Sequence, residues 1–186
     1  SNESGKISNT VLFVSQPGDY SAKALQLFAR AVSDCSGLKA IYKLHPSEDL
    51  RNYDPLIRDG LVQTKQIEKD MQFYDVLRAA DVVVGTVSTA LLEAIALRKP
   101  VLQLLPELSH TDWAQYGLAV ASTESELCDW LLSITKDPNY CERLLQAEQK
   151  LMREMLSTIE GASTEIADYL RQLLRQQVGL KKAYRC

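Results

Sequence analysis

Apolar residues follow two alternating patterns along this chain. Short runs rich in Val, Leu, Ile and aromatic residues, bounded by Gly, Pro or polar residues, have the length and composition of buried strands. Between them lie longer segments in which apolar residues recur every three or four positions, as on one face of a helix. The predicted strands are 11–14, 39–44, 61–63 (the weakest), 82–84 and 101–105. The predicted helices between them are 20–34, 72–80 and 89–98.

This alternation predicts an α/β fold. Parallel strands joined through a helix form right-handed crossovers, which place helices on both faces of the sheet. We therefore predict a Rossmann-like, doubly wound parallel sheet over residues 11–135, preceded by a disordered or tag-derived N-terminus at 1–10.

Helix signals also follow the last predicted strand. Thr123 and Glu126 have the spacing of a capping box, which predicts a helix from there through about residue 134. From residue 139 onward two long amphipathic helices are predicted, with a break near Gly161. We expect residues 136–186 to pack as extra C-terminal helices on the same domain.

The composition is that of an ordinary globular protein. Its 186 residues suffice for one substantial core, and hydrophobic residues make up 46% and charged residues 24% of the chain. A formal net charge of -3 gives no electrostatic case for a nucleic-acid partner, and no apolar run has the length of a membrane span. No signal peptide is recognisable, so we expect a cytoplasmic protein, with peripheral association at the inner face of the membrane left open.

The cysteines and histidines do not form a recognisable metal site. The chain has 4 Cys and 2 His, and no two Cys have the Cys-x-x-Cys spacing of a zinc or redox motif. We therefore expect no bound metal. We interpret Cys35, Cys128, Cys141 and Cys186 as free thiols in a reducing compartment.

The segment 85–93 carries the strongest functional signal. It follows the apolar strand 82–84, contains small and hydroxyl residues, and opens a predicted helix, whose start points free backbone N–H groups at any anion above the turn. With Ser88 as the N-cap, Thr89 and Glu93 lie one turn apart on the same helix face. This spacing suits a nucleoside diphosphate, with its phosphates at the helix start and its ribose hydroxyls on the Glu93 carboxylate. The alternative is an ordinary capped helix in which Glu93 only complements the dipole.

Two other strand ends carry polar or turn residues. Ser15 and Gln16 follow the first strand, and His45 and Ser47 follow the second. Because the carboxyl ends of parallel strands share one edge, these loops and the turn at 85–89 are predicted to line one crevice. A histidine there could donate to a phosphate oxygen and offset the charge of a leaving group. The alternative is a structural residue that only ends the strand.

Several common nucleotide and hydrolase motifs are absent from the sequence. No Gly-x-Gly-x-x-Gly follows the first strand, and no Gly-x-x-x-x-Gly-Lys-Ser/Thr loop occurs. The Gly-x-Ser-x-Gly nucleophile elbow is also missing, and Ser15-Gln16 stands where a phosphoacceptor receiver domain has an acidic pair. These absences argue against a nicotinamide dinucleotide enzyme, a P-loop nucleotidase, a serine hydrolase and a receiver domain.

Two stretches of the sequence resemble the donor-binding half of GT-B glycosyltransferases. They are Lys43-Leu44-His45-Pro46 and, further along, Tyr74-Asp75-Val76-Leu77-Arg78-Ala79-Ala80-Asp81-Val82-Val83-Val84-Gly85 followed by Ser88-Thr89-Ala90-Leu91-Leu92-Glu93-Ala94. The resemblance is to groups that build bacterial surface polysaccharides, namely capsule polymerases, polysialyltransferases and CDP-glycerol glycerophosphotransferases. It spans residues 11–105.

The resemblance implies a nucleotide-sugar donor and roles for residues in the predicted crevice. It implies that His45, Ser88 and Thr89 bind the donor phosphates. Glu93 would hold the ribose, and Ser15 and Gln16 would border the donor. No cofactor or metal is implied, and no catalytic residue is assigned beyond His45 as a stabiliser of the leaving-group phosphate. The candidate donor-binding residues are Ser15, Gln16, His45, Ser47, Thr86, Ser88, Thr89 and Glu93.

A GT-B enzyme also has an N-terminal acceptor-binding domain with its usual catalytic base, for which this chain has no room. We therefore expect a glycosyltransferase domain of a longer protein, inactive alone and prone to self-association through apolar surface that its partner domain would cover. UDP-N-acetylglucosamine 2-epimerases share the architecture and a similar Ser-to-Glu turn. A non-catalytic Rossmann-like interaction module is a further alternative. In a donor-binding domain, the nucleotide base is expected near residues 64–67.

Overall fold

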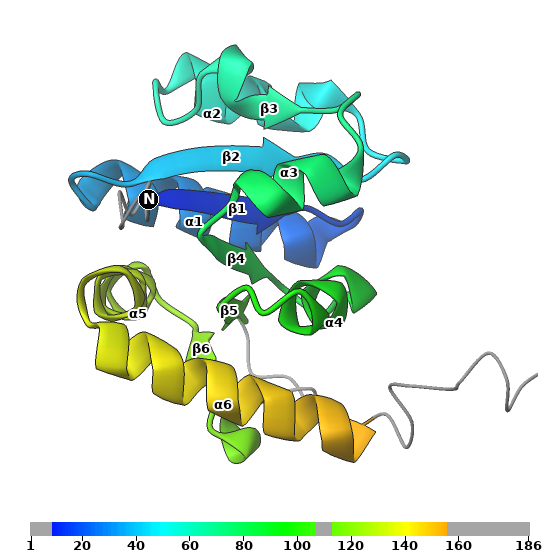
Figure 1. The fold of residues 1–186 in the computed structure, drawn as a ribbon. Coiled ribbons are helices and arrows are strands. Elements are labelled where there is room, and N and C mark those ends of the chain that lie inside the picture. The colour runs from blue at the N-terminus through cyan, green and yellow to red at the C-terminus, as the bar shows by residue number, and fades with distance from the viewer. Residues whose placement is uncertain (1–8, 107–112, 156–186) are drawn as a thin grey trace, which may run out of the picture. The chain divides into compact units, whose positions relative to one another are not determined.

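The computed structural model describes residues 9–106 and 113–155, which contain one six-stranded sheet with all strands parallel (Figure 1). Its order is β3-β2-β1-β4-β5-β6, and it lies in the first of two compact units, Ser1–Leu151 and Met152–Cys186. The predicted doubly wound, Rossmann-like sheet is confirmed. The strands are β1 (Thr10–Val14), β2 (Lys39–Lys43), β3 (Ile67–Glu68), β4 (Val82–Gly85), β5 (Val101–Leu104) and β6 (Ala119–Ala121).

Helices join the strands in the described part of the chain. Thr123 and Glu126 form the predicted capping box at the start of α5. The helix expected beyond Gly161 lies outside the described residues. The α-helices are α1 (Asp19–Asp34), α2 (Asp54–Arg58), α3 (Phe73–Ala79), α4 (Thr89–Ala96), α5 (Glu124–Lys136) and α6 (Pro138–Met155). Short 3-10 helices are η1 (Leu50–Tyr53), η2 (Thr64–Gln66) and η3 (Trp113–Tyr116).

One face of the sheet packs against α1 and α5. Phe13 of β1 and Tyr42 of β2 are buried against Phe28 of α1, with ring centroids 4.9 Å apart for Phe13 and Phe28 and 5.4 Å for Phe28 and Tyr42. Leu127 and Leu131 of α5 belong to the same buried cluster. Removing each such side chain from water contributes about 1.5–3 kcal/mol, so this face anchors the sheet.

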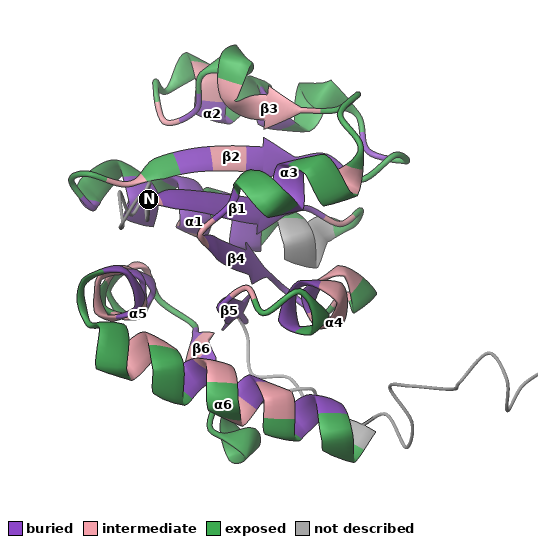
Figure 2. Ribbon diagram, in the orientation of Figure 1, coloured by how far each residue is buried: buried purple, intermediate pink, exposed green. Residues whose placement is uncertain are grey.

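The opposite face of the sheet is covered by α3 and α4, and the central strands are buried on both sides (Figure 2). Because side chains alternate along a strand, Leu12 and Val83 point away from the aromatic cluster, and both are still fully buried. Leu91 of α4 lies so close to Gly85 that a Cβ on Gly85 would come within 3.0 Å of it. Gly85 therefore lets α4 approach the end of β4 and positions the β4–α4 turn.

The strand order reverses around β1. Val14, the last residue of β1, pairs with Lys43 of β2 on one side and Gly85 of β4 on the other. In open parallel sheets, ligand sites form beyond the carboxyl ends of the strands at this point of reversal. The loops after β1, β2 and β4 are thus the place for a site.

The predicted strand at 61–63 is wrong, because the third strand is β3 and lies further along the chain. The amides of Leu61 and Val62 donate to the carbonyl of Leu56 at 2.9 and 3.2 Å, and Gly60 takes a positive φ of 74, so this segment closes the end of α2. Val62 is apolar because it packs in the core rather than because it pairs in the sheet. The helices η1 and α2 themselves were not predicted.

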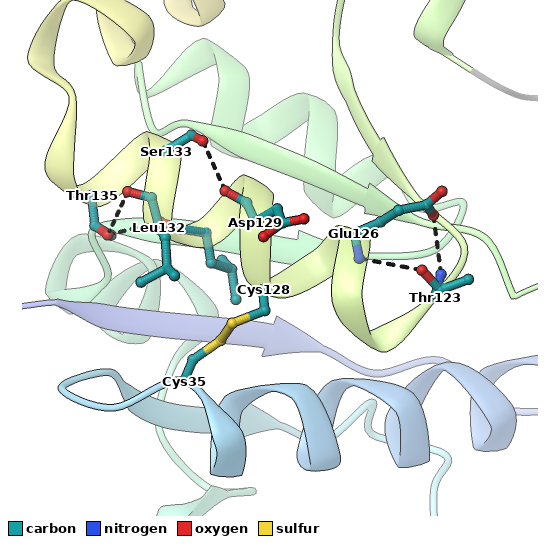
Figure 3. Close-up of a disulfide and its surroundings, with 9 residues drawn as sticks. Cys35, Thr123, Glu126, Cys128, Asp129, Leu132, Ser133 and Thr135 are labelled. Carbon is teal, nitrogen blue, oxygen red and sulfur yellow. Dashed lines mark hydrogen bonds between the residues drawn. A yellow bond between two sulfur atoms is a disulfide. The ribbon is translucent and has the colours of Figure 1, made fainter.

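Two of the four cysteines are joined, which corrects the interpretation of all four as free thiols. Cys35 follows α1 and Cys128 lies on α5, and the two form a disulfide with Cα atoms 6.1 Å apart (Figure 3). The packing of α1 against α5 brings these residues together across a sequence separation of 93, which no local spacing could reveal. Cys141 is free, and Cys186 lies outside the described residues.

Candidate functional site

A pocket of about 660 Å³ lies at the carboxyl edge of β1, β2 and β4, within the range of small-molecule sites. The three loops therefore meet in one crevice, as the strand pattern predicts. That the residues there bind a ligand stays a prediction. Of the candidate residues, Ser47 and Thr86 do not line the pocket, whereas the following do: Ser15, Gln16, His45, Ser88, Thr89 and Glu93.

The start of α4 forms one wall of this pocket. Ser88 is the N-cap, and its Oγ accepts a hydrogen bond from the Ala90 amide at 3.2 Å. The hydroxyl acts here as an acceptor, so its own O–H can donate to a ligand. Glu93 lines the pocket one turn further along, so the positive end of a helix dipole and a carboxylate share this wall.

Gln16 fastens the loop after β1 to the turn before α4. Its Oε1 accepts from the Thr86 hydroxyl at 2.7 Å, and its Nε2 donates to the Val87 carbonyl at 2.6 Å. Thr86 is 1% exposed, so it holds Gln16 from below the pocket rather than facing a ligand. This arrangement makes Thr86 a positioning residue, and it makes Gln16 a positioning residue as well as part of the pocket wall.

Glu48 ties the loops after β1 and β2 together. It is 9% exposed, and its Oε1 accepts from the Ser15 hydroxyl at 2.8 Å while its Oε2 accepts from the His45 amide at 3.0 Å. The Ser15 hydroxyl therefore donates to Glu48, which limits what it can offer to a ligand. Glu48 lies two residues beyond the His-Pro pair, but no local pattern indicates that its side chain folds back onto the loop.

The ring of His45 is oriented by Ser47. The Ser47 amide donates to Nδ1 of His45 at 3.2 Å, and the Ser47 Oγ lies 2.7 Å from the same nitrogen. A nitrogen that accepts from a backbone N–H carries no proton, so the neutral ring holds its proton on Nε2. His45 can thus donate from Nε2, and Ser47, predicted as a ligand contact, serves to fix the tautomer.

One wall of the pocket was not predicted from the sequence. The segment between β3 and α3 lines it through Lys69, Asp70, Met71 and Gln72, together with Phe73 at the start of α3. The segment 64–67, where base recognition was expected, does not line this pocket. The third strand was predicted at 61–63 but lies at Ile67–Glu68, so the loop expected to follow it was also predicted too early in the chain.

Two further side chains at the pocket had no predicted role. Lys43, at the end of β2, is 9% exposed and lines the pocket. Tyr74 on α3 interacts with the Glu93 carboxylate, and this interaction raises the pKa of Tyr74 above its usual value. A lysine in an otherwise buried strand is a signal that could have been noticed, whereas the Tyr74–Glu93 pair depends on how α3 and α4 lie.

The described residues hold no group of three or more His, Cys, Asp or Glu side chains arranged for a metal ion. Likewise, none of the described helices has both the length and the apolar character needed to cross a membrane.

Comparison with known proteins finds likeness in structure only. No protein-family model matches this chain, and no curated protein sequence matches it. A mutant of the Thermobaculum terrenum O-GlcNAc transferase aligns with 22% identity and a TM-score of 0.56, covering 90% of this chain and 36% of that one. A Listeria monocytogenes protein assigned as a UDP-N-acetylglucosamine 2-epimerase aligns with 13% identity and a TM-score of 0.57, covering 79% and 44%.

Another UDP-N-acetylglucosamine 2-epimerase aligns with 17% identity and a TM-score of 0.51, covering 81% of this chain and 43% of that one. This chain thus spans less than half the length of each of these structures. Identities this low show the fold and no more. The chain has the α/β, Rossmann-like fold that matches one part of these larger GT-B-type proteins.

Proposed function

We propose that this chain is the nucleotide-sugar-binding domain of a GT-B glycosyltransferase, acting in the synthesis of bacterial surface or capsular polysaccharide. One observation carries the proposal. The pocket at the strand reversal combines the capped start of α4 with the Glu93 carboxylate one turn away. An anion site beside a carboxylate acceptor matches the phosphates and ribose of a nucleotide.

Each part of the donor has a matching group in this arrangement. The phosphates meet the Thr89 amide at the start of α4 and the hydroxyls of Ser88 and Thr89, since the Ala90 and Leu91 amides already donate to Ser88. Nε2–H of His45 donates to a phosphate oxygen from the β2 side. The ribose hydroxyls donate to Glu93, because a carboxylate has about four lone-pair sites that can accept hydrogen bonds.

The chemical step of such a transfer breaks the bond between the sugar carbon and the phosphate oxygen. The nucleotide leaves with the bonding electrons, so negative charge grows on its phosphate, where His45 and the α4 dipole stabilise it. The attacking hydroxyl of the acceptor gives its proton to a base. The acceptor-binding part of the protein would supply that base.

The binding test is a calorimetric titration of the chain with CMP, CDP, UDP and GDP, which measures affinity and base preference together. Ser88→Ala and His45→Ala should each weaken binding about tenfold or more, because a lost charge-assisted hydrogen bond costs about 1.5–3 kcal/mol. Ser133→Ala is the matched control, since the Ser133 hydroxyl lies on α5 and donates to a carbonyl of its own helix. Unchanged affinity in both pocket variants would remove the site assignment.

An epimerase-type isomerase is the second candidate, favoured by the structural likeness to two UDP-N-acetylglucosamine 2-epimerases. It uses the same donor pocket, so binding alone does not separate it from a transferase. Analysis of the products that the full-length protein forms from UDP-N-acetylglucosamine separates the two candidates. A free epimerised sugar indicates the isomerase, and a glycosylated acceptor indicates the transferase. A non-catalytic interaction module predicts that no nucleotide binds.

A further inference from the structure

Lys43 is a buried cation that none of these roles uses. Its Nζ donates to the Lys69 carbonyl at 2.8 Å, which occupies one of its three N–H donors. Among the described residues, no carboxylate forms an ion pair with it. Taking an ammonium group out of water without an opposite charge is costly. The pocket therefore holds a largely buried positive charge with donors left for a ligand.

The described carboxylates near the pocket form no ion pair with Lys43. Glu68 of β3 is the register partner of Lys43 in the sheet, yet the two side chains are not joined by an ion pair. Glu48 accepts from the Ser15 hydroxyl and from the His45 amide, and Glu93 lies on α4, which follows β4 on the other side of β1 from Lys43. Asp70 lines the pocket but is exposed, so water screens its charge. None of them neutralises Lys43 as an anionic ligand in the pocket would.

Lys43 and the start of α4 stand on opposite sides of β1. Val14 pairs with both Lys43 and Gly85, so the backbones of Lys43 and Gly85 lie two strand spacings apart, about 10 Å. Val14 lines the pocket between them. A ligand with two linked anionic groups, one at the start of α4 and the other over β1, would be held from both sides.

We propose that Lys43 binds the second phosphate of a nucleoside diphosphate, and that the pocket thereby selects diphosphate-linked over monophosphate-linked donors. This inference rests on the proposed nucleotide-binding function and narrows its substrate class. The first phosphate keeps its place at the α4 start, and the Lys43 ammonium neutralises the charge that the second phosphate adds. CMP-linked donors, which carry one phosphate, gain nothing from Lys43.

The experiment compares matched nucleotide pairs by calorimetry, UDP with UMP, CDP with CMP and GDP with GMP. The wild-type chain should bind the diphosphate of its preferred base at least tenfold more tightly than the monophosphate. Lys43→Met keeps the buried stem and removes the charge, so it should weaken diphosphate binding at least tenfold and monophosphate binding less than threefold. Lys136→Met makes the same charge change at an exposed position at the end of α5, outside this pocket, and should alter neither affinity.

Equal weakening of both members of a pair would mean that Lys43 only holds the Lys69 carbonyl, and the proposal would be wrong. If the wild-type chain bound the diphosphate and the monophosphate with nearly equal affinity, that result alone would overturn the proposal. If thermal melts show that Lys43→Met does not fold, Lys43→Gln takes its place, because its neutral amide can still donate to the Lys69 carbonyl, and it should lose the diphosphate preference. Diphosphate binding that Lys43→Met leaves unchanged overturns this inference alone, whereas no binding of any nucleotide overturns the proposed function with it.

Discussion

The Thr86 hydroxyl donates to the side-chain oxygen of Gln16 at 2.7 Å, across the point where the strand order reverses. Thr86 follows β4 and Gln16 follows β1, so this bond joins the two loops that frame the pocket. Gln16 completes the connection by donating to the Val87 carbonyl, just before the start of α4. The position of the anion-binding turn therefore depends on a side-chain contact between distant parts of the chain.

Thr86→Val should weaken nucleotide binding although Thr86 does not line the pocket. The change keeps the shape of the side chain and removes the buried hydroxyl that donates to the Gln16 oxygen. We expect a loss of about 1 kcal/mol in folding stability and a severalfold loss in affinity, because the turn before α4 is less firmly held. Urea unfolding and calorimetry measure the two effects.

Thr135→Val provides the control for this change. Thr135 is also buried and donates to a carbonyl, that of Leu131, but it lies on α5 on the other face of the sheet. Thr135→Val should lower the free energy of unfolding by a similar amount and leave nucleotide affinity unchanged. If both variants lose affinity in proportion to stability, Gln16 and Thr86 have no positioning role.

The contrast between Ser88 and Glu48 shows which parts of the site sequence could predict. Ser88 caps α4 through its own near neighbours, so the local pattern of strand, turn and helix was sufficient. Glu48 acts on Ser15 across 33 residues, and Gln16 acts on Thr86 across 70, so their partners depend on the assembled sheet.

The same distinction applies to the fold. Residues 82–84 were recognisable as a strand because burial on both faces demands a continuous apolar run. Val62 is equally apolar, but it packs in the core from a loop. A prediction from composition alone therefore put the third strand at the wrong residues. Cys35 and Cys128 meet only because α1 packs on α5, which explains why their pairing was not foreseen.

Glu148 should make folding stability depend on pH. It is fully buried on α6, its Oε1 accepts from the Val101 amide at 2.6 Å, and burial raises its pKa to about 8. Between the ordinary value of 4.5 and about 8, the unfolded chain releases a proton that the folded chain keeps. Stability therefore falls as pH rises through this window, by about 1.4 kcal/mol for each unit of pKa shift at most.

Urea midpoints measured from pH 5 to pH 8 test this dependence on Glu148. Glu148→Gln cannot ionise, so its midpoint should fall less steeply and exceed the wild-type midpoint at pH 8. Glu142→Gln, at an exposed position on the same helix, should retain the wild-type slope. Parallel slopes in all three proteins would show that Glu148 does not titrate in this way.

Reduction of the disulfide should destabilise the domain. The Cys35–Cys128 bond closes a loop across a separation of 93 residues, which in the chain-entropy model stabilises the fold by about 4–5 kcal/mol. Thermal melts with and without reductant, and of Cys35→Ser, should show the same lower transition for the two reduced forms. Thiol titration in denaturant should find two fewer thiols before reduction than after it, and an unchanged count would disprove the bond.

Glu93→Gln should separate a ribose contact from a structural role. The substitution keeps the shape of the side chain but replaces a charged acceptor with a neutral one, so ribonucleotide affinity should fall about tenfold, the equivalent of about 1.4 kcal/mol. The 2′,3′-dideoxy analogues cannot donate to Glu93, so their weaker affinity should stay within twofold of the wild-type value. Tyr74→Phe is the companion variant, because it removes the hydroxyl whose pKa Glu93 raises and leaves the carboxylate in place. Tyr74→Phe should lower the affinity for ribonucleotides and for dideoxy analogues by less than threefold. Equal weakening of ribonucleotides and dideoxy analogues by Glu93→Gln would instead indicate that the carboxylate serves only the α4 dipole or the packing of α3 on α4.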